Sequence, residues 1–331
     1  MRATVPVLLA LLLVAVMVVA AGIGPYAIAP LEILGAVIRR AGGGEMDAAE
    51  TVLFQIRLPR VLAAALVGAA LSAAGAAYQS LFRNPLVSPD ILGVSSGAGF
   101  GAVLGILLGL SVAAIQLLAF AGGLATVAVV ATLARALRGG DLLVLVLSGI
   151  VVGALASAAI SLVKVLADPY DQLPAITFWL LGSLAGVTPA DVAAVLPFVV
   201  VGLLPLVLLR WRIGVLSLGD DEARALGVEA GPLRAAVIGA ATLITASAVA
   251  VSGVVGWVGL MVPHMARLLV GPRFDRLLPA SVLVGATFMV AADTLARSLA
   301  QVEVPLGVLT ALIGGPTFVW LLARSRRRHL P

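Results

Sequence analysis

The sequence predicts an all-α polytopic membrane protein with ten transmembrane helices, and composition and segment length carry this prediction. Of the 331 residues, 62% are hydrophobic and 11% are charged, and the mean hydropathy is +1.17. A soluble protein of this length needs a charged surface that these residues do not supply, so we expect lipid to surround the chain. Ten apolar segments have roughly the length needed to cross a bilayer as a helix, about 20 residues. We interpret residues 1–331 as one membrane-embedded domain.

The ten predicted spans divide evenly between the two halves of the chain. In the first half they are 5–24, 60–82, 91–110, 114–137 and 142–166. In the second half they are 190–209, 235–255, 257–270, 278–298 and 305–323. The eighth span is too short to cross unaided, so it must lean on its neighbours. Gly75 precedes Pro85 by ten residues, as Gly253 precedes Pro263, which is a weak indication of an inverted internal repeat.

The basic residues predict the orientation of these spans. With an even number of spans, both ends of the chain lie on one side of the membrane. If that side is the cytoplasm, 15 of the 21 Lys and Arg residues lie there and 6 lie outside, in agreement with the positive-inside rule. We therefore expect both termini in the cytoplasm. The polar start of segment 168–182 predicts a short helix at the outer face.

Glycines follow a regular spacing in the third predicted span. They stand at every fourth position, as Gly93, Gly97, Gly101, Gly105 and Gly109. This spacing places them on one helical face, where another backbone can approach closely. We expect this face to pack against a neighbouring helix. A bundle of small residues that keeps its charges at the ends is typical of a conduit.

Three arginines lie at predicted outer ends of spans, namely Arg57, Arg60 and Arg297. Three convergent guanidinium groups would suit the docking of carboxylates from a soluble partner. Arginines also reach for the membrane interface at span ends without any partner, and the residues leave both interpretations open. Asp293 lies well inside a predicted span, four residues before Arg297, so we expect these two side chains to form an ion pair.

The longest hydrophilic stretch between spans is the predicted cytoplasmic loop 211–234. Asp220, Asp221 and Glu222 start a short helix there, where the helix dipole favours acidic side chains, and Gly227 can end it. A short amphipathic helix on such a loop suits docking to a partner, although an ordinary solvated connector has the same pattern. A metal–diphosphate site built from the three acids is a weaker interpretation, because the sequence has no second acidic cluster.

The sequence lacks the motif for ATP hydrolysis and the helical zinc-protease motif. The sequence has no G-x-x-x-x-G-K-[ST] motif, and its single lysine, Lys164, follows no glycine. It also lacks H-E-x-x-H and cysteine. If ATP drives transport, another subunit hydrolyses it. An ion-coupled secondary transporter would need more intramembrane carboxylates than Asp293, and a lipid-transferring enzyme would need a clustered acidic or histidine site.

Segments spread over nearly the whole chain resemble the FecCD-type permeases, the membrane subunits of ABC importers for iron–siderophores, haem and cobalamin. The matching segments are 57–60 (RLPR), 81–86 (LFRNPL), 92–98 (LGVSSGA), 178–183 (FWLLGS), 219–227 (GDDEARALG), 256–264 (GWVGLMVPH), 292–297 (ADTLAR) and 305–314 (PLGVLTALIG). The resemblance implies a cobalamin-permease-like fold of ten helices in the bacterial inner membrane. It also implies a dimer around a central pathway, with a second copy or a paralogue as the other half.

The same resemblance implies partners and site residues. Two cytoplasmic ATPase subunits would bind ATP and Mg, whereas this chain would bind no cofactor or metal. A periplasmic or lipoprotein substrate-binding protein would present glutamates to Arg57, Arg60 and Arg297. The segment seated in the ATPase would comprise Leu218, Gly219, Asp220, Asp221, Glu222, Arg224, Leu226 and Gly227. Asn84, Leu86, Gly140 and Asp141 would line a cytoplasmic gate, although Gly140 and Asp141 depart from the small hydroxyl residues expected there.

The cargo is poorly encoded in this chain. An apolar conduit without fixed internal charge offers a bulky chelate no tight site, so specificity would reside mostly in the binding protein. The family resemblance favours an iron chelate, either a siderophore or haem. Cobalamin and molybdate-type oxyanions are the alternatives within the family.

Overall fold

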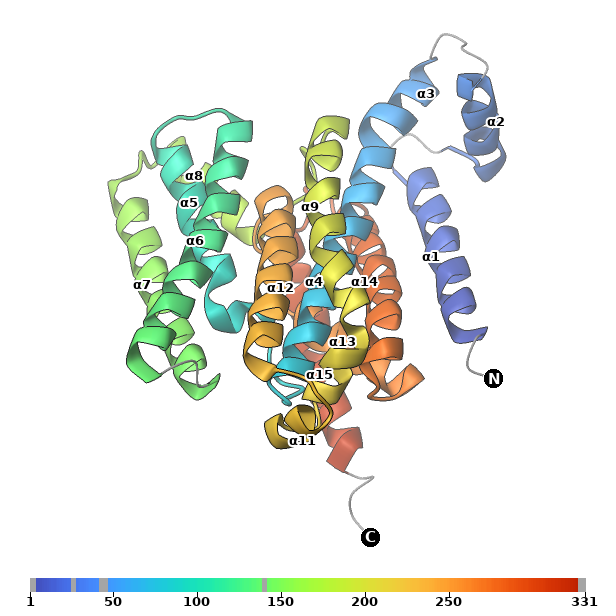
Figure 1. Cartoon of the computed structure of the whole chain (residues 1–331). Helices are drawn as coiled ribbons and strands as arrows, with labels where there is room; N and C mark the ends of the chain where they lie inside the picture. The colour runs from blue at the N-terminus through green and yellow to red at the C-terminus, as the bar shows by residue number, and fades with distance from the viewer. Residues whose placement is uncertain (1–3, 25–27, 42–46, 139–141, 327–331) are drawn as a thin grey trace.

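The computed structural model describes residues 4–24, 28–41, 47–138 and 142–326, and every regular element within these ranges is a helix (Figure 1). Ten of these helices occupy the ten predicted spans, which confirms the all-helical fold. They are α1 (Thr4–Gly22), α4 (Leu58–Leu81), α5 (Val94–Leu107), α6 (Val112–Arg138), α7 (Leu142–Leu166), α9 (Pro189–Leu208), α12 (Ala230–Ser252), α13 (Val258–Val270), α14 (Phe274–Ala296) and α15 (Leu306–Arg326). Within the described ranges, seven helices are long and apolar enough to cross a membrane, and α5, α13 and α15 are shorter apolar helices.

The third predicted span is shorter than expected. The sequence predicts a helix over 91–110, but α5 has 14 residues and follows a 3₁₀ turn, η2 (Pro89–Leu92). Gly93 separates the two helices with a φ of +76°, a left-handed conformation that favours glycine. Pro89 starts η2 at a position where its missing N–H costs no helical hydrogen bond. The apolar sequence pattern therefore continues across Gly93, although the helix does not.

The segment before the second span contains three helical elements that the hydropathy pattern did not predict. They are α2 (Pro30–Ala41), α3 (Ala48–Thr51) and the π-helical η1 (Val52–Arg57). A capping box between Asp47 and Glu50 starts α3, and the helical path then continues through η1 into α4. Glu50 also accepts a 2.6 Å hydrogen bond from Arg39 Nε, which ties α2 to α3. These elements are too short or too polar to appear as membrane spans.

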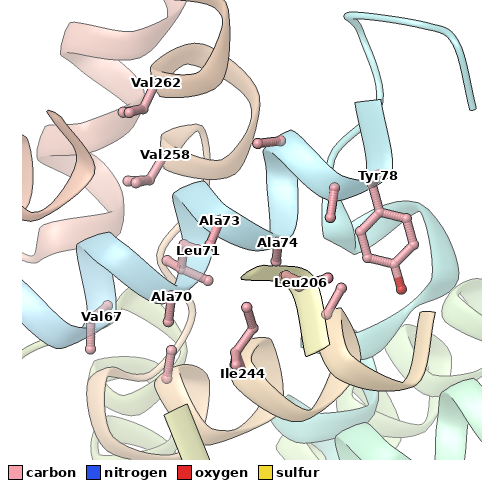
Figure 2. Packing of buried hydrophobic residues seen from close by; sticks show 14 of the residues in the cluster. Val67, Ala70, Leu71, Ala73, Ala74, Tyr78, Leu206, Ile244, Val258 and Val262 are labelled. Carbon is pink, nitrogen blue, oxygen red and sulfur yellow. The ribbon is translucent and has the colours of Figure 1, made fainter. Parts of the chain in front are cut away.

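Helix α4 lies at the centre of the bundle. In its most apolar stretch 83% of the residues are buried, against 11% for α1 and 22% for both α7 and α9. Figure 2 shows its small side chains, among them Ala70, Ala73 and Ala74, packed among Ile244 of α12 and Val258 of α13. Alanine and glycine let neighbouring helices approach closely, which provides the packing contacts that drive helix association in lipid.

The two ends of the bundle carry different connecting helices (Figure 1). At one end lie α2, α3 and α8 (Gln172–Leu181), and α8 falls within the segment predicted as a short outer helix. At the opposite end lies α11 (Asp220–Ala225), which follows α10 (Arg210–Leu216). The segments predicted to be cytoplasmic and those predicted to be outside therefore lie at opposite ends of one helical bundle.

Candidate functional site

Arg60 stands between two carboxylates at the α3 end of the bundle. Its Nε lies 3.0 Å from both carboxylate oxygens of Asp293, and its Nη2 lies 2.9 Å from Oδ1. The guanidinium also donates to Glu303, from Nη1 to Oε1 at 2.7 Å and from Nη2 to Oε2 at 2.9 Å. Paired hydrogen bonds between a guanidinium and a carboxylate are the strong form of this interaction. Arg60 thus joins α4 to α14 and to the connection between α14 and α15.

Arg57 and Arg297 bind the carboxyl-terminal end of α1. Arg57 Nη1 donates to the carbonyl oxygens of Ala21 at 2.8 Å and Gly22 at 3.0 Å. Arg297 donates to the carbonyl oxygens of Ala20 and Ile23. The last carbonyls of a helix have no partner within it, and a cation near them is favoured by the helix dipole. The two arginines therefore cap α1, a helix that buries little of its own surface.

The three arginines thus converge, as the docking interpretation requires, but their guanidinium groups already have acceptors within the chain. Arg57 is 5% exposed and Arg60 is 9% exposed. The expected pair of Asp293 with Arg297 is present at 3.8 Å, yet Asp293 makes its shorter contacts with Arg60. Sequence reasoning missed Glu303 and the α1 carbonyls. An acidic residue in the loop six positions after Arg297 was the available signal for Glu303.

Helices α10 and α11 place the predicted coupling residues at the opposite end. Leu218 and Leu226 are 62% and 54% exposed, whereas Ala223 between them is fully buried. An ion pair from Asp220 to Arg234 fixes α11 against α12. Asp221 and Arg224 form an exposed pair at 3.5 Å, so both remain at the surface.

Glycines define both ends of α11. A Cβ at Gly219, whose φ is +147°, would lie 2.1 Å from a carboxylate oxygen of Glu222. Gly227, with a φ of +74°, ends the helix, and its N–H donates to Arg224 O at 3.0 Å. A cavity of about 340 Å³ lies beside this loop, between α10 and the start of α14. Its lining includes Trp211, Leu218 and Phe274. The loop therefore has a short helix held by an ion pair to α12, two exposed leucines and an adjoining cavity.

The predicted gate residues that the structure describes lie in the turn after α4. The side chain of Asn84 accepts a hydrogen bond from the N–H of Leu86 at 2.9 Å, which closes a local turn. Leu86 is 52% exposed. Gly140 and Asp141 lie outside the described residues.

Three of the five spaced glycines lie within α5 and face α6. A Cβ at Gly101 would lie 2.1 Å from the carbonyl oxygen of Leu118, and one at Gly97 would lie 2.6 Å from that of Gly122. Gly105 is less tightly packed, with its closest neighbour, a side-chain atom of Ile115, at 3.1 Å. Gly93 precedes the helix and faces both α7 and Thr126 of α6, and Gly109 follows the helix with no described atom within 4 Å of its Cβ position. The stripe is therefore shorter than the sequence spacing suggests.

A further cavity of about 630 Å³ lies between α6, α7 and α12. Its walls are mainly apolar, and Arg135 and Arg234 are its charged lining residues. It lies toward the end of the bundle where α12 begins, so it adjoins the loop that carries α11.

Known proteins match this chain over most of its length. The FecCD transport family matches residues 11–324. The molybdate import system permease protein MolB of Haemophilus influenzae is 42% identical over 96% of this chain and 95% of its own length. The hemin transport system permease protein HmuU of Yersinia pestis is 39% identical over 86% of each chain. A solved structure described as an inward-facing metal-chelate type ABC transporter superposes with a TM-score of 0.88, at 39% identity, over 97% of this chain and 99% of that one.

Proposed function

Because this chain belongs to the FecCD transport family, the membrane permease subunits of ABC importers, we propose that it carries an iron chelate, a siderophore or haem, into the bacterial cytoplasm. The observation that carries the proposal is the family match over nearly the whole chain, together with a relative named for hemin transport. The family provides the membrane pathway, and its ATPase partner uses ATP. We place this chain in the inner membrane with both termini in the cytoplasm.

We assign the α10–α11 loop to ATPase binding. Leu218 and Leu226 are exposed on a segment that Asp220 and Arg234 hold in place. Exposed leucines rimmed by charge have the chemistry of a protein contact. A rigid segment can transmit the movement of an ATPase subunit to α12, to which it is paired. Asp221, Glu222, Arg224 and Gly227 complete the contact in this proposal.

We assign the opposite end of the bundle to the binding protein. Arg57, Arg60 and Arg297 concentrate three positive charges there against two carboxylates, Asp293 and Glu303. The excess positive charge favours an acidic partner surface. The binding protein and the ATPase would then dock at opposite ends of one bundle. From these positions they can drive the alternation between outward-facing and inward-facing states.

We further propose that two copies of the chain enclose the transport pathway. Helix α7 exposes a long apolar face, including Leu147, Val151 and Leu155, which are 52%, 55% and 65% exposed. In the membrane such a face contacts lipid or another helix. With a second copy, Asn84 and Leu86 would close the cytoplasmic end of the pathway. Pairing with a paralogue would use the same face.

Molybdate is a second candidate cargo. MolB, a relative named for molybdate import, is 42% identical over 96% of this chain, which is a longer match than that of HmuU. Among the described residues, the buried charges of Arg60 and Asp293 pair with each other, so they give no basis for selecting an oxyanion over a neutral chelate. The binding protein would therefore decide between these cargoes, and cobalamin remains an alternative.

Uptake of different cargoes into proteoliposomes tests the cargo assignment. The permease and its ATPase are reconstituted in proteoliposomes, and the binding protein is loaded in turn with haem, a ferric siderophore, cobalamin or molybdate. We expect uptake with haem or a siderophore. Uptake of molybdate alone would replace the iron chelate as cargo and leave the family function intact.

A further inference from the structure

Arg60 holds two carboxylates of very different exposure. The side chain of Asp293 is 2% exposed, whereas that of Glu303 is 40% exposed. Asp293 belongs to α14, in the packed bundle, and Glu303 belongs to the connection between α14 and α15. The guanidinium of Arg60 is thus paired on one side with the buried Asp293 and on the other with the partly exposed Glu303.

The described contacts of the neighbouring arginines are of a different kind. Arg57 and Arg297 donate to backbone carbonyls at the end of α1, and these acceptors cannot leave without moving the helix. The carboxylate beside Arg297 is the buried Asp293. A partner that brings a carboxylate to this surface can therefore replace Glu303 with less rearrangement than it would need to replace the backbone carbonyls described here as acceptors of Arg57 and Arg297.

We propose that Glu303 occupies the docking position for a carboxylate of the binding protein, and that docking exchanges one carboxylate for the other on Arg60. This inference rests on the proposed docking role of this surface. The exchange leaves Arg60 with two carboxylate partners before and after docking, so the buried charge stays balanced. Glu303 moves into solvent, which is accessible to it already.

The surroundings of Glu303 fit a contact surface. Leu299 and Val302, in the same connection, are 61% and 73% exposed. A docking protein would cover these apolar side chains while its carboxylate displaces Glu303, so that burial of apolar surface accompanies the charge exchange. Glu303 thereby weakens docking and also keeps Arg60 paired when no partner is bound.

The test uses Glu303→Gln, because reversing the charge of Arg60 would place a third carboxylate against Asp293 and Glu303. The full transporter with its ATPase is placed in lipid nanodiscs, and the dissociation constant for its substrate-binding protein is measured. A partly exposed ion pair contributes a modest free energy, so we expect Glu303→Gln to tighten binding about two- to fivefold. Asp171→Asn, at an exposed position near the start of α8, is the charge-matched control.

A second measurement needs no partner. Phenylglyoxal modifies accessible guanidinium groups, and mass spectrometry assigns the modified arginines. We expect Arg60 to react faster in Glu303→Gln than in the wild type or in Asp171→Asn, while Arg57 and Arg297 stay protected in all three.

The outcomes separate this proposal from the assigned function. Unchanged or weaker binding in Glu303→Gln, or an equal gain in Asp171→Asn, would overturn the exchange. So would unchanged labelling of Arg60. A binding protein that fails to associate with any form, with Arg60 newly labelled in Glu303→Gln, would refute the docking role and keep only the shielding of Arg60 by Glu303.

Discussion

Gly75 of α4 and Gly259 of α13 bring two helices into backbone contact. A Cβ at Gly75 would lie 1.8 Å from the carbonyl oxygen of Gly259, and one at Gly68 would lie 2.1 Å from that of Gly285 in α14. Both obstacles are backbone atoms, which cannot rotate away as a side chain can. Helix α4 therefore meets α13 and α14 at positions that accept glycine alone.

Replacing Gly75 by alanine should destabilise the bundle. The added methyl group forces α4 and α13 apart, and overpacking of this kind costs about 1–3 kcal/mol. Thermal unfolding in detergent measures the loss. Gly239→Ala in α12 is the matched control, because its Cβ would meet no described atom within 4 Å. Equal melting temperatures for Gly75→Ala and the wild type would contradict the close contact.

Asp293→Asn should be strongly destabilising. The substitution leaves Arg60 with Glu303 as its one described carboxylate and removes the carboxylate beside Arg297, and breaking a buried pair costs about 3–5 kcal/mol. Asp221→Asn should have little effect, since Asp221 and Arg224 are 94% and 79% exposed and such pairs contribute about 0–1 kcal/mol. Denaturant unfolding in detergent compares the two variants. Equal stability of the variants would show that the ion pair of Arg60 does not support the bundle.

Alanine substitutions along α5 should destabilise the protein to different extents, according to how closely each glycine is packed against α6. A Cβ at Gly101 would lie 2.1 Å from the backbone of Leu118, whereas one at Gly105 would have its nearest neighbour, a side-chain atom of Ile115, at 3.1 Å. We expect Gly101→Ala to lower the melting temperature more than Gly105→Ala does, and larger side chains to widen the difference. The reverse order would mean that α5 and α6 meet along a different face.

The exposed leucines near α11 should matter for assembly and not for folding. Leu218→Ser combined with Leu226→Ser removes apolar surface that we assign to the ATPase contact. We expect at least a fivefold loss of ATPase binding, corresponding to about 1 kcal/mol, with an unchanged melting temperature. Tyr170→Ser is the control, because Tyr170 is 91% exposed near α8, at the other end of the bundle. An unchanged affinity in the double variant would remove the coupling role of these leucines.

Hydropathy predicts the spans well because the bilayer requires long apolar helices that hydrogen-bond internally. The predicted segment 142–166 ends at the same residue as α7, Leu166. Hydropathy does not predict α2 or η1, because these helices are too short to span the membrane. It also misplaces the start of α5, where the left-handed Gly93 interrupts an apolar run.

The site was predictable only in part, for a related reason. Spacing along one helix indicated the pair of Asp293 and Arg297, which are four residues apart. The stronger pair, Arg60 with Asp293, joins residues 233 positions apart, and no local pattern carries that information. Likewise, the composition of α4 predicts close packing, but only the folded arrangement identifies Gly259 as the neighbour of Gly75.

Uptake by proteoliposomes that contain this permease, its ATPase and the loaded binding protein distinguishes ATP-driven import from ion-coupled transport. The measurement is made with and without internal ATP, and in the presence of ionophores that dissipate ion gradients. We expect uptake that requires ATP and persists with the ionophores. Uptake that continues without ATP and stops when the gradients are dissipated would contradict the account and identify an ion-coupled transporter.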